Sequence, residues 1–299
     1  MPDERLETYL GARSRLLRHA YRFLGSASEA EDAVQEAWLR YAKAECVEDG
    51  PAFLTRIVGN LCLDRLRSAQ HRREHYVGPW LPEPLVERAG TTETDYDAAL
   101  DISYAVMCAL ERLSPLERAA LFLHDMFDMS FEEVGAAIDR SPATCRKLAS
   151  RARQAIRAEK PRYPASEADL ARFEASFVAA TRTGDVSGLM AVLSADVELI
   201  PDGGGKVSAA NRIVVGARAV ARLLVGLAGL PGSADLRFEK AWVNGGQGLV
   251  IWRDGSIEQV MGFDVDEEGL IGAIYEIRNP EKLEHLQPAP ADGTGADMH

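Results

Sequence analysis

The period of the hydrophobic pattern changes near Ser166, and this change restricts the fold more than any other feature of the sequence. Before residue 160, apolar side chains recur at helical spacing, and helix-capping signals separate the apolar segments. The signals are the pairs Ser28/Glu31, Ser114/Glu117 and Ser130/Glu133. We therefore expect this part of the chain to be helical.

After Asp196 the pattern becomes strand-like, with one further helix expected near Ala217–Leu227. The expected strands are Leu236–Val243, Leu249–Arg253, Ile257–Val265 and Leu270–Arg278. Short turn signals such as Asp254-Gly255 separate them, which favours an antiparallel meander. Helices followed by strands predict a multidomain chain, with two all-α domains and then an α+β domain.

Composition argues against several classes of protein. Apolar residues make up 46% of the 299-residue chain, enough to bury real cores, and no run approaches the roughly 18 apolar residues of a membrane span. The charged N-terminus argues against a secretion signal. The four cysteines form no CxxC pair, so neither a zinc ribbon nor a disulfide scaffold is indicated. We expect a cytoplasmic protein with no metal, no other cofactor and no membrane contact.

The net charge of −12 would by itself argue against binding to nucleic acid. The charge is unevenly distributed, however, because the segment Arg140–Arg157 carries six basic side chains and no acidic one. Local potential decides phosphate binding, so one basic helix is more informative than the average charge. A solvated helix face with a charge bias is the alternative interpretation.

Residues 130–157 have the spacing of a helix-turn-helix unit, with the turn at Asp139–Pro142. In such units the early residues of the second helix reach base edges, a position that Arg146, Lys147 and Ser150 would occupy. Arg151 and Arg153 are better placed for backbone phosphates. The face with Leu148, Ala152 and Ala155 is expected to pack against the rest of the domain. A helical hairpin without DNA contacts remains the alternative.

A second polar stripe follows Pro51 along a helix whose other face is apolar. It consists of Arg56, Asn60, Asp64 and Arg67, continued by Arg72 and Arg73. Residues 51–80 hold five basic and two acidic side chains, so this segment is net basic. From composition alone, an ordinary exposed face and a nucleic-acid contact are equally acceptable.

Three segments resemble a known family. The sequences AYRFLGS at 20–26 and EAEDAVQEAWLR at 29–40 resemble region two of extracytoplasmic-function sigma factors. The sequence IVGNLCLDRLR at 57–67 is similar to the promoter-melting helix of that region, and residues 113–157 resemble region four. The resemblance covers about half of the chain in the expected order.

The resemblance implies partners and residue roles. Core RNA polymerase would be bound through its β′ clamp and β flap, and promoter DNA through two elements. The polymerase face would consist of Asp32, Gln35, Glu36, Leu39 and Arg40. The minus-ten element would contact Arg56, Asn60, Asp64, Arg67, Arg72 and Arg73, with the loop Glu45–Gly50 completing a pocket for a flipped base. The minus-thirty-five element would contact Arg146, Lys147, Ser150, Arg151 and Arg153.

The last domain is similar to the SnoaL-like family, a cone-shaped α+β fold that a subgroup of these sigma factors carries as an extension. Three motifs carry this resemblance: Trp80-Leu81-Pro82-Glu83-Pro84, Asp202-Gly203-Gly204-Gly205-Lys206 and Asn279-Pro280-Glu281-Lys282-Leu283, the last with Glu281 where Asp is expected. The resemblance implies regulation in cis, with no separate anti-sigma factor required. A plain glycine turn is the alternative for residues 203–205, and Glu83 is a candidate partner for Lys206.

The expected domains are region two at 5–75, a linker at 76–100, region four at 101–159, the SnoaL-like domain at 166–286 and a disordered tail at 287–299. We expect the last domain to rest against region two and the linker, because its acidic excess would face a basic stripe. The expected function is transcription initiation without enzymatic activity.

Two other classes of function are considered. The first is an enzyme, or a sensor of an unknown small-molecule ligand, with a DNA-binding appendage. Its candidate groups would be Asp202, Glu198, Asp264, Glu276 and Tyr275, with Trp242 and Trp252 as pocket walls, although a core role for the aromatic rings is favoured. A P-loop is rejected because Val207 follows Lys206. The second class is a dimeric one-component regulator.

Overall fold

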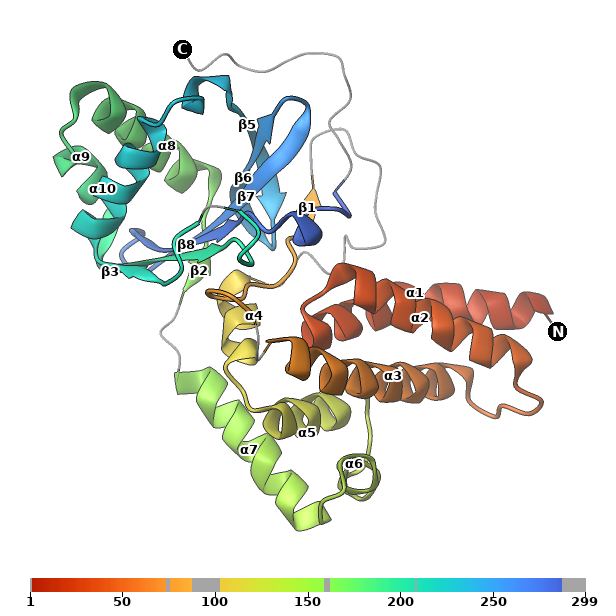
Figure 1. Cartoon of the computed structure of the whole chain (residues 1–299). Coiled ribbons are helices and arrows are strands. Elements are labelled where there is room, and N and C mark those ends of the chain that lie inside the picture. Colours follow the sequence, from red (N-terminus) through yellow and green to blue (C-terminus); the bar gives the residue numbers. More distant parts are fainter. Residues whose placement is uncertain (1, 74–75, 88–102, 159–161, 208, 287–299) are drawn as a thin grey trace. The chain divides into compact units, whose positions relative to one another are not determined.

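The helical part of the sequence forms helices α1–α7 (Figure 1). Their bounds are α1 Pro2–Leu24, α2 Ala27–Lys43, α3 Gly50–Arg73, α4 Tyr104–Glu111, α5 Pro115–Asp125, α6 Phe131–Ile138 and α7 Pro142–Ala158. The computed structural model describes residues 2–73, 76–87, 103–158, 162–207 and 209–286. Of these, residues 2–73 and 106–158 form one compact unit, unit 1, and the rest form unit 2.

Two of the three expected capping boxes are confirmed. Ser114 and Ser130 each accept a bond from the backbone three residues on, and Glu117 and Glu133 bond back. The third expectation was wrong, because α2 begins earlier and its cap is Ser26, which accepts from the Glu29 N–H at 3.1 Å. Ser28 lies inside the first turn, where its hydroxyl meets that of Ser26.

Unit 1 has one core that joins α1 to α5. Phe23 of α1 stacks on Phe122 of α5 with ring centroids 5.0 Å apart. Arg118 of α5 is 2% exposed, forms an ion pair with Glu111 of α4 and donates to the Arg22 carbonyl at 3.2 Å. A guanidinium at this depth is tolerated because both partners are in place.

The α6–α7 pair forms the expected helix-turn-helix. Asp139 ends α6 in the left-handed region, and the Ser141 hydroxyl accepts from the Thr144 N–H to begin α7. Gly135 is needed at this turn because a Cβ there would lie 2.5 Å from the Arg140 carbonyl oxygen. The buried face of α7 is Cys145, Ala149 and Ala152. The buried face is therefore slightly rotated from the expected one, because Ala155 is exposed.

Unit 2 is a mixed α/β structure. Its helices are α8 Glu167–Thr183, α9 Ser187–Met190 and α10 Ala217–Ala228, with single 3₁₀ turns at Ser233–Asp235 and Pro280–Lys282. Its strands are β1 Val86–Glu87, β2 Tyr163–Pro164, β3 Leu193–Asp202, β4 Val214–Val215, β5 Arg237–Val243, β6 Gly246–Arg253, β7 Ser256–Val265 and β8 Ile271–Ile277. The helices cover one face of the sheet (Figure 1).

The strand order is β1-β5-β6-β7-β8-β3-β4, and β2 pairs with β7. The meander β5–β8 is antiparallel as expected. The expectation of a wholly antiparallel sheet was wrong, because β3 pairs with β8 in parallel. Between β3 and β8 the chain forms β4, α10 and the strands β5–β7 of the meander. Strand β8 then runs beside β3 in the same direction.

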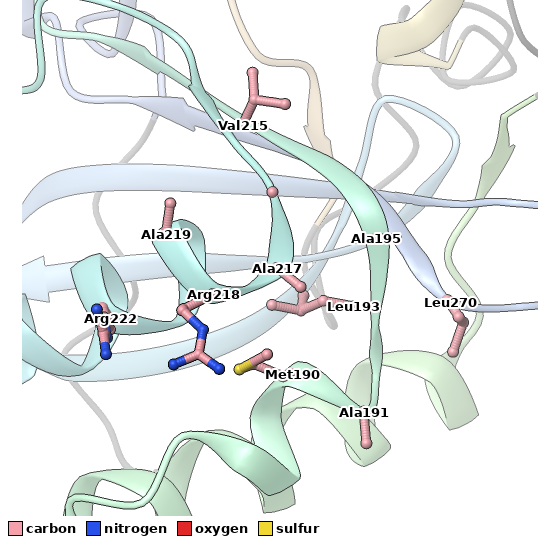
Figure 2. A pocket seen from close by; sticks show the side chains of 11 residues that line it. Met190, Ala191, Leu193, Ala195, Val215, Ala217, Arg218, Ala219, Arg222 and Leu270 are labelled. Atoms are coloured by element: carbon pink, nitrogen blue, oxygen red, sulfur yellow. The ribbon is translucent and has the colours of Figure 1, made fainter.

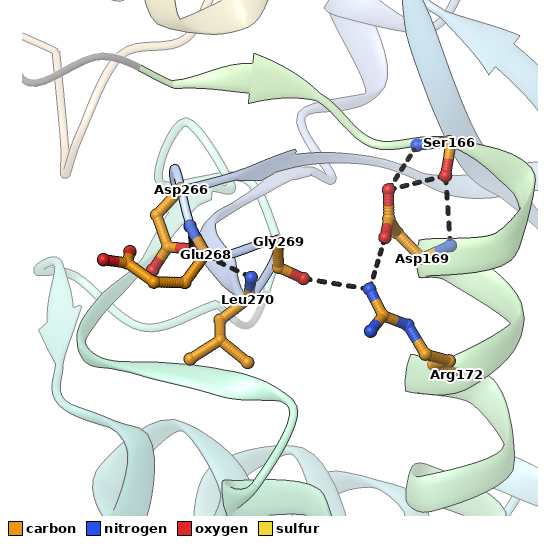
Figure 3. Close-up of polar contacts among 7 residues, drawn as sticks. All are labelled: Ser166, Asp169, Arg172, Asp266, Glu268, Gly269 and Leu270. Carbon is orange, nitrogen blue, oxygen red and sulfur yellow. Dashed lines mark hydrogen bonds and ion pairs between the residues drawn. The ribbon is translucent and has the colours of Figure 1, made fainter.

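Side chains from the helices and the sheet fill the interior of unit 2. Phe173 of α8 packs on Phe263 of β7 with ring centroids 5.1 Å apart, inside a cluster of buried apolar residues that includes Leu199 and Val220. A network around α8 fixes the turn between β7 and β8 (Figure 3). Arg172 bonds to Asp169, a capping residue of α8, and donates to the Gly269 carbonyl at 3.0 Å.

We expect Arg118→Ala to destabilise unit 1 by about 3–5 kcal/mol, because it leaves the Glu111 carboxylate without its partner in a buried position. Hydrogen exchange of the α5 amides in the full chain measures this loss. Arg151→Ala is the matched control, since Arg151 is exposed and its loss should cost under about 0.5 kcal/mol. Equal exchange in the two variants would contradict the role of Arg118.

Candidate functional site: three polar helix faces and a linker-binding cluster

The residues expected to face polymerase form an exposed stripe on α2. Asp32, Gln35, Leu39 and Arg40 are exposed, and Leu39 is 50% accessible. Glu36 pairs with Arg40 at 2.9 Å within the stripe. The opposite face of α2, with Ala33, Val34 and Ala37, is buried. The stripe is therefore polar and accessible within unit 1, with one large apolar side chain.

The stripe expected to read the minus-ten element lies on α3, and part of it is engaged by α6. Arg56 pairs with Glu133 at 2.8 Å, and Arg67 donates to the Ala137 carbonyl at 2.8 Å. Asn60 and Asp64 are exposed. The side chains of Arg72 and Arg73, at the end of α3, lie outside the described residues. Two of the cations that would meet phosphates are thus bonded to the helix-turn-helix.

The residues expected to read the minus-thirty-five element lie on the outer face of α7. Lys147, Ser150 and Arg151 are exposed, and Arg146 pairs with Glu132 of α6 at 3.2 Å. Arg153 differs, because it donates to Asp125 of α5 at 2.9 Å and so holds α7 on α5. The Asp125 carboxylate raises the pKa of the Arg153 guanidinium. The Arg153 guanidinium therefore stays protonated, and the Asp125 carboxylate offsets part of its positive charge.

The three motifs of the SnoaL-like resemblance meet in unit 2 around Asp202, which is fully buried. Its carboxylate accepts from the Tyr76 hydroxyl, from the Leu81 N–H at 2.7 Å and from the Lys282 ammonium at 2.7 Å. Burial, and then the Asp202 carboxylate, raise the pKa of the Tyr76 phenol, which therefore stays protonated and donates. We call Tyr76, Asp202, Asn279 and Lys282 the Asp202 cluster.

Lys282 completes the attachment of the linker. Its ammonium lies 3.9 Å from the centroid of the Trp80 ring and also donates to the Leu81 carbonyl. Asn279 donates to the Tyr76 hydroxyl at 2.8 Å. A cation over an aromatic face is most favourable when water is excluded, and Lys282 is only 6% exposed.

The glycine run approaches this cluster closely. Gly204 has a φ of +59°, and a Cβ there would lie 2.5 Å from the Asn279 side-chain nitrogen. The run is thus more than a plain turn, because Gly204 lies against the Asp202 cluster. Lys206 forms its ion pair with Glu281. The prediction that Glu83 is its partner was wrong, because Lys206 pairs with Glu281 of the third motif.

The rest of the described linker continues along the sheet. The Leu85 N–H donates to the Asn244 side chain at 2.9 Å, and the Asn244 N–H donates to the Leu85 carbonyl at 3.0 Å. Val86 and Glu87 then pair with β5 as β1. The expected linker 76–100 is therefore part of unit 2 as far as residue 87, and the remainder lies outside the described residues, as does the tail 287–299.

A second polar cluster binds the residues that begin α4. Tyr104 stacks on Tyr275 of β8 with ring centroids 4.8 Å apart, above Gly262, where a Cβ would lie 2.8 Å from the ring. Asp264 is 2% exposed and accepts from the Tyr275 hydroxyl at 2.9 Å and from the Ala105 N–H at 3.2 Å. Sequence reasoning missed Tyr104, because no motif surrounds it.

The residues that follow α7 also belong to unit 2. Arg162 pairs with Glu198 of β3 at 2.6 Å, and Tyr163 and Pro164 pair with β7 as β2. The rest of α4 and the helices α5–α7 therefore lie in the sequence between two segments that unit 2 holds, Tyr104–Ala105 at the start of α4 and Arg162–Pro164.

Three of the candidate groups for an enzyme, Glu198, Tyr275 and Asp264, are connected through Arg162, which interacts with both Glu198 and Tyr275. In this network the Tyr275 hydroxyl donates to Asp264, and Arg162 supplies the cation, whereas Asp202 belongs to the separate Asp202 cluster. Trp252 donates to Glu239 at 2.8 Å, Trp242 lies on β5 beside β1, and burial raises the pKa of Glu276.

In the described part of the chain, no three acidic, histidine or cysteine side chains form a metal-binding group. Nor is any described helix long and apolar enough to cross a membrane.

The arrangement of an exposed α2 stripe, a polar α3 and a basic helix-turn-helix defines a sigma factor. Residues 9–72 match the family model for Sigma-70 region 2, and residues 103–156 match that for Sigma-70 region 4. The chain is 38% identical to the ECF RNA polymerase sigma factor SigJ of Mycobacterium tuberculosis, over 96% of each protein. The chain belongs to the ECF RNA polymerase sigma factors.

A second relative and a solved structure agree with the assignment to the sigma factors. The probable ECF sigma factor SigI of Mycobacterium tuberculosis is 30% identical over 68% of this chain and 69% of that protein. The crystal structure of Mycobacterium tuberculosis SigJ matches with a TM-score of 0.73 and 34% identity, over 93% of this chain and 98% of that one. The match confirms the expected fold of helical sigma domains followed by a mixed sheet and helices.

We expect Asp202→Asn to release residues 76–87 from unit 2. The change leaves the Lys282 ammonium buried without an anion, at a cost of about 3–5 kcal/mol. Faster hydrogen exchange of residues 76–87 in the full chain would show it. Adding Lys282→Met should recover part of the lost stability of unit 2, because no unpaired ammonium is left, but residues 76–87 stay released, since the Lys282 bond to the Leu81 carbonyl is also lost. Glu281→Gln is the control, since its exposed pair with Lys206 is worth under about 1 kcal/mol.

The stability of unit 2 should depend on Asp264 between pH 4 and 7. Burial raises the pKa of Asp264 from 3.8 to about 6, against the lowering effect of the bonds from Tyr275 and Ala105. The folded state thus holds this proton more tightly than the unfolded chain. The stabilisation is present below pH 4 and is lost as the pH rises through about 6.

Asp264→Asn removes this titration, and the amide oxygen can accept the same two bonds. Relative to the variant, the parent should lose up to about 3 kcal/mol of unfolding free energy between pH 4 and 7. Urea unfolding followed by tryptophan fluorescence at several pH values measures the difference, in which the contribution of Glu276 cancels. A difference that does not change with pH would contradict the assignment.

Proposed function

We propose that this sigma factor directs core RNA polymerase to promoters with the surfaces of unit 1. The α2 stripe of Asp32, Gln35, Glu36, Leu39 and Arg40 contacts the β′ clamp of polymerase. Acidic groups suit this role because they meet protein and not phosphate. A central exposed leucine supplies the apolar contact that such interfaces need.

In the same proposal, α3 reads the minus-ten element and α7 reads the minus-thirty-five element. Asn60 and Asp64 hold an extruded base, while Arg56, Arg67, Arg72 and Arg73 meet backbone phosphates. Arg146, Lys147 and Ser150 reach base edges in the major groove, and Arg151 and Arg153 meet phosphates. The protein performs no covalent chemistry in this role.

Unit 2 regulates this activity in cis, without a separate anti-sigma factor. The observation that carries this proposal is the Asp202 cluster, which buries the chain directly after region two. Only residues 74 and 75 separate α3 from Tyr76 in the sequence, so the chain enters this cluster almost directly after region two. Unit 2 also holds the segments on either side of region four. It therefore controls how far the two DNA-reading regions can separate.

The contacts between α3 and α6 describe the restrained state. Arg56 and Arg67 cannot meet phosphates while they bond to Glu133 and to the Ala137 carbonyl. Both contacts are exposed, and each is worth under about 1 kcal/mol. Promoter phosphates can displace them easily once the linker permits the regions to separate. The buried linker attachment, and not the exposed pairs, then determines the activity.

The test is transcription in vitro with core polymerase on a library of random promoters, read by sequencing the transcripts. The full chain should select defined promoters that core polymerase alone does not use. Asn60→Ala should lower this transcription roughly tenfold or more, because a flipped base loses its contacts. The double variant Asp202→Asn/Lys282→Met should raise it several-fold.

Glu281→Gln serves as the matched control for the double variant and should leave transcription unchanged. If no variant selects promoters, the sigma assignment of these surfaces fails. If promoters are selected but the double variant is no more active than the parent, regulation through the Asp202 cluster is refuted, while the assignment of the DNA-reading helices stands.

A further inference from the structure

We propose that unit 2 binds an amphipathic organic acid, an apolar chain or ring that ends in one carboxylate, in an open groove beside helix α10. The groove has a volume of about 820 Å³. It is lined by α9, the start of β3, β4, the first turns of α10 and the turn between β7 and β8 (Figure 2). This proposal goes beyond the sigma activity and is tested without it.

The groove lies outside the filled interior of the domain. The core between helices and sheet is closed by side chains such as Phe173, Phe263 and Leu199. A ligand site inside the cone would have to displace them, at a cost of several kcal/mol. The groove needs no such change, and its volume lies within the range of about 300–1,000 Å³ typical of ligand sites.

One side of the groove is apolar. Met190, Leu193, Ala195, Val215 and Leu270 contribute hydrocarbon or thioether surface. Val215 is 57% exposed and belongs to β4, the strand at one edge of the sheet. A β-branched side chain so exposed gains stability when a hydrocarbon covers it.

Two cations define the other side. Arg218 and Arg222 lie one turn apart on α10, and both line the groove. Figure 2 shows the Arg218 side chain extending toward Met190. Neither guanidinium takes part in a hydrogen bond or ion pair with another described residue. Two adjacent guanidinium groups repel each other, and a carboxylate that accepts from both relieves this repulsion.

The backbone adds to the same charge. Helix α10 is preceded by Gly216, which has no side chain to cap the first turn, and Ala217–Ala219 line the groove. Their N–H groups have no partner within the helix and favour an anion. The far wall is rigid, because Asp266 accepts from the Leu270 N–H at 2.9 Å and Arg172 fixes Gly269 (Figure 3).

The ligand must therefore combine an apolar body with one acidic group. A simple anion would leave the apolar wall uncovered, and a neutral hydrocarbon would leave the two arginines unpaired. Arginine binds a carboxylate with two parallel bonds, which gives orientation as well as affinity. The acid group lies at α10, and the apolar body extends over Met190 and Leu193 toward Val215.

The test uses decanoate as the probe and isothermal titration calorimetry on the full chain, below the concentration at which decanoate forms micelles. Decanoate should bind saturably with one site per chain, and decanol or acetate should bind at least roughly tenfold more weakly. Arg218→Gln and Arg222→Gln should each weaken decanoate binding about five- to tenfold. Val215→Asp should abolish it.

Arg212→Gln is the matched control, because Arg212 is exposed in the same unit but does not line the groove. It should leave the affinity unchanged within about twofold, and each variant should keep the parent's thermal transition. The proposal is overturned if decanoate shows no saturable binding, or if the Arg218 and Arg222 variants bind it as tightly as the Arg212 variant does.

Discussion

The buried ion pair between Asp202 and Lys282 is the interaction on which the rest of unit 2 depends. Both side chains are almost fully buried, so each charge is tolerated only because the other lies beside it. A pair of this kind gives little net stability compared with apolar packing. It does impose a unique geometry, because Tyr76 and Leu81 must donate to the same carboxylate. The pair therefore fixes where the linker runs.

Much of the helical half could be predicted from the sequence, because capping and apolar periodicity are local. Ser114 and Ser130 begin helices as expected, and the turn at Asp139 is encoded within a few residues. The predictions were wrong where the sequence allows two helix starts or two buried faces. Ser26 and Ser28 can both cap a helix, and packing against α1 decides between them. The rotated face of α7 has a similar cause, since small alanines on several sides leave the periodicity ambiguous.

The functional contacts were harder to predict, because they join residues far apart in the sequence. The three motifs singled out in the sequence do meet in the structure, but no spacing rule shows that Asp202 bonds to Tyr76 and Lys282, and their regulatory role stays a prediction. The prediction that Glu83 pairs with Lys206 was wrong for the same reason, because the actual partner, Glu281, is also far away in the sequence. Tyr104 and Arg162 carry no local signal, and their roles depend on strands formed a hundred or more residues later. The exposed stripes on α2, α3 and α7 needed only helical periodicity.

Two kinds of contact with different energies then coexist in one chain. The α3–α6 contacts are exposed ion pairs and a single carbonyl bond, which salt and DNA phosphates weaken. The linker bonds of Leu81, Leu85 and Lys282 are buried, so salt screens them much less. The α3–α6 contacts are therefore the weaker of the two kinds, and the attachment of residues 76–87 to unit 2 is the stronger. Under the proposed regulation in cis, the signal would have to change the buried cluster itself or act on the sheet to which the linker is bonded.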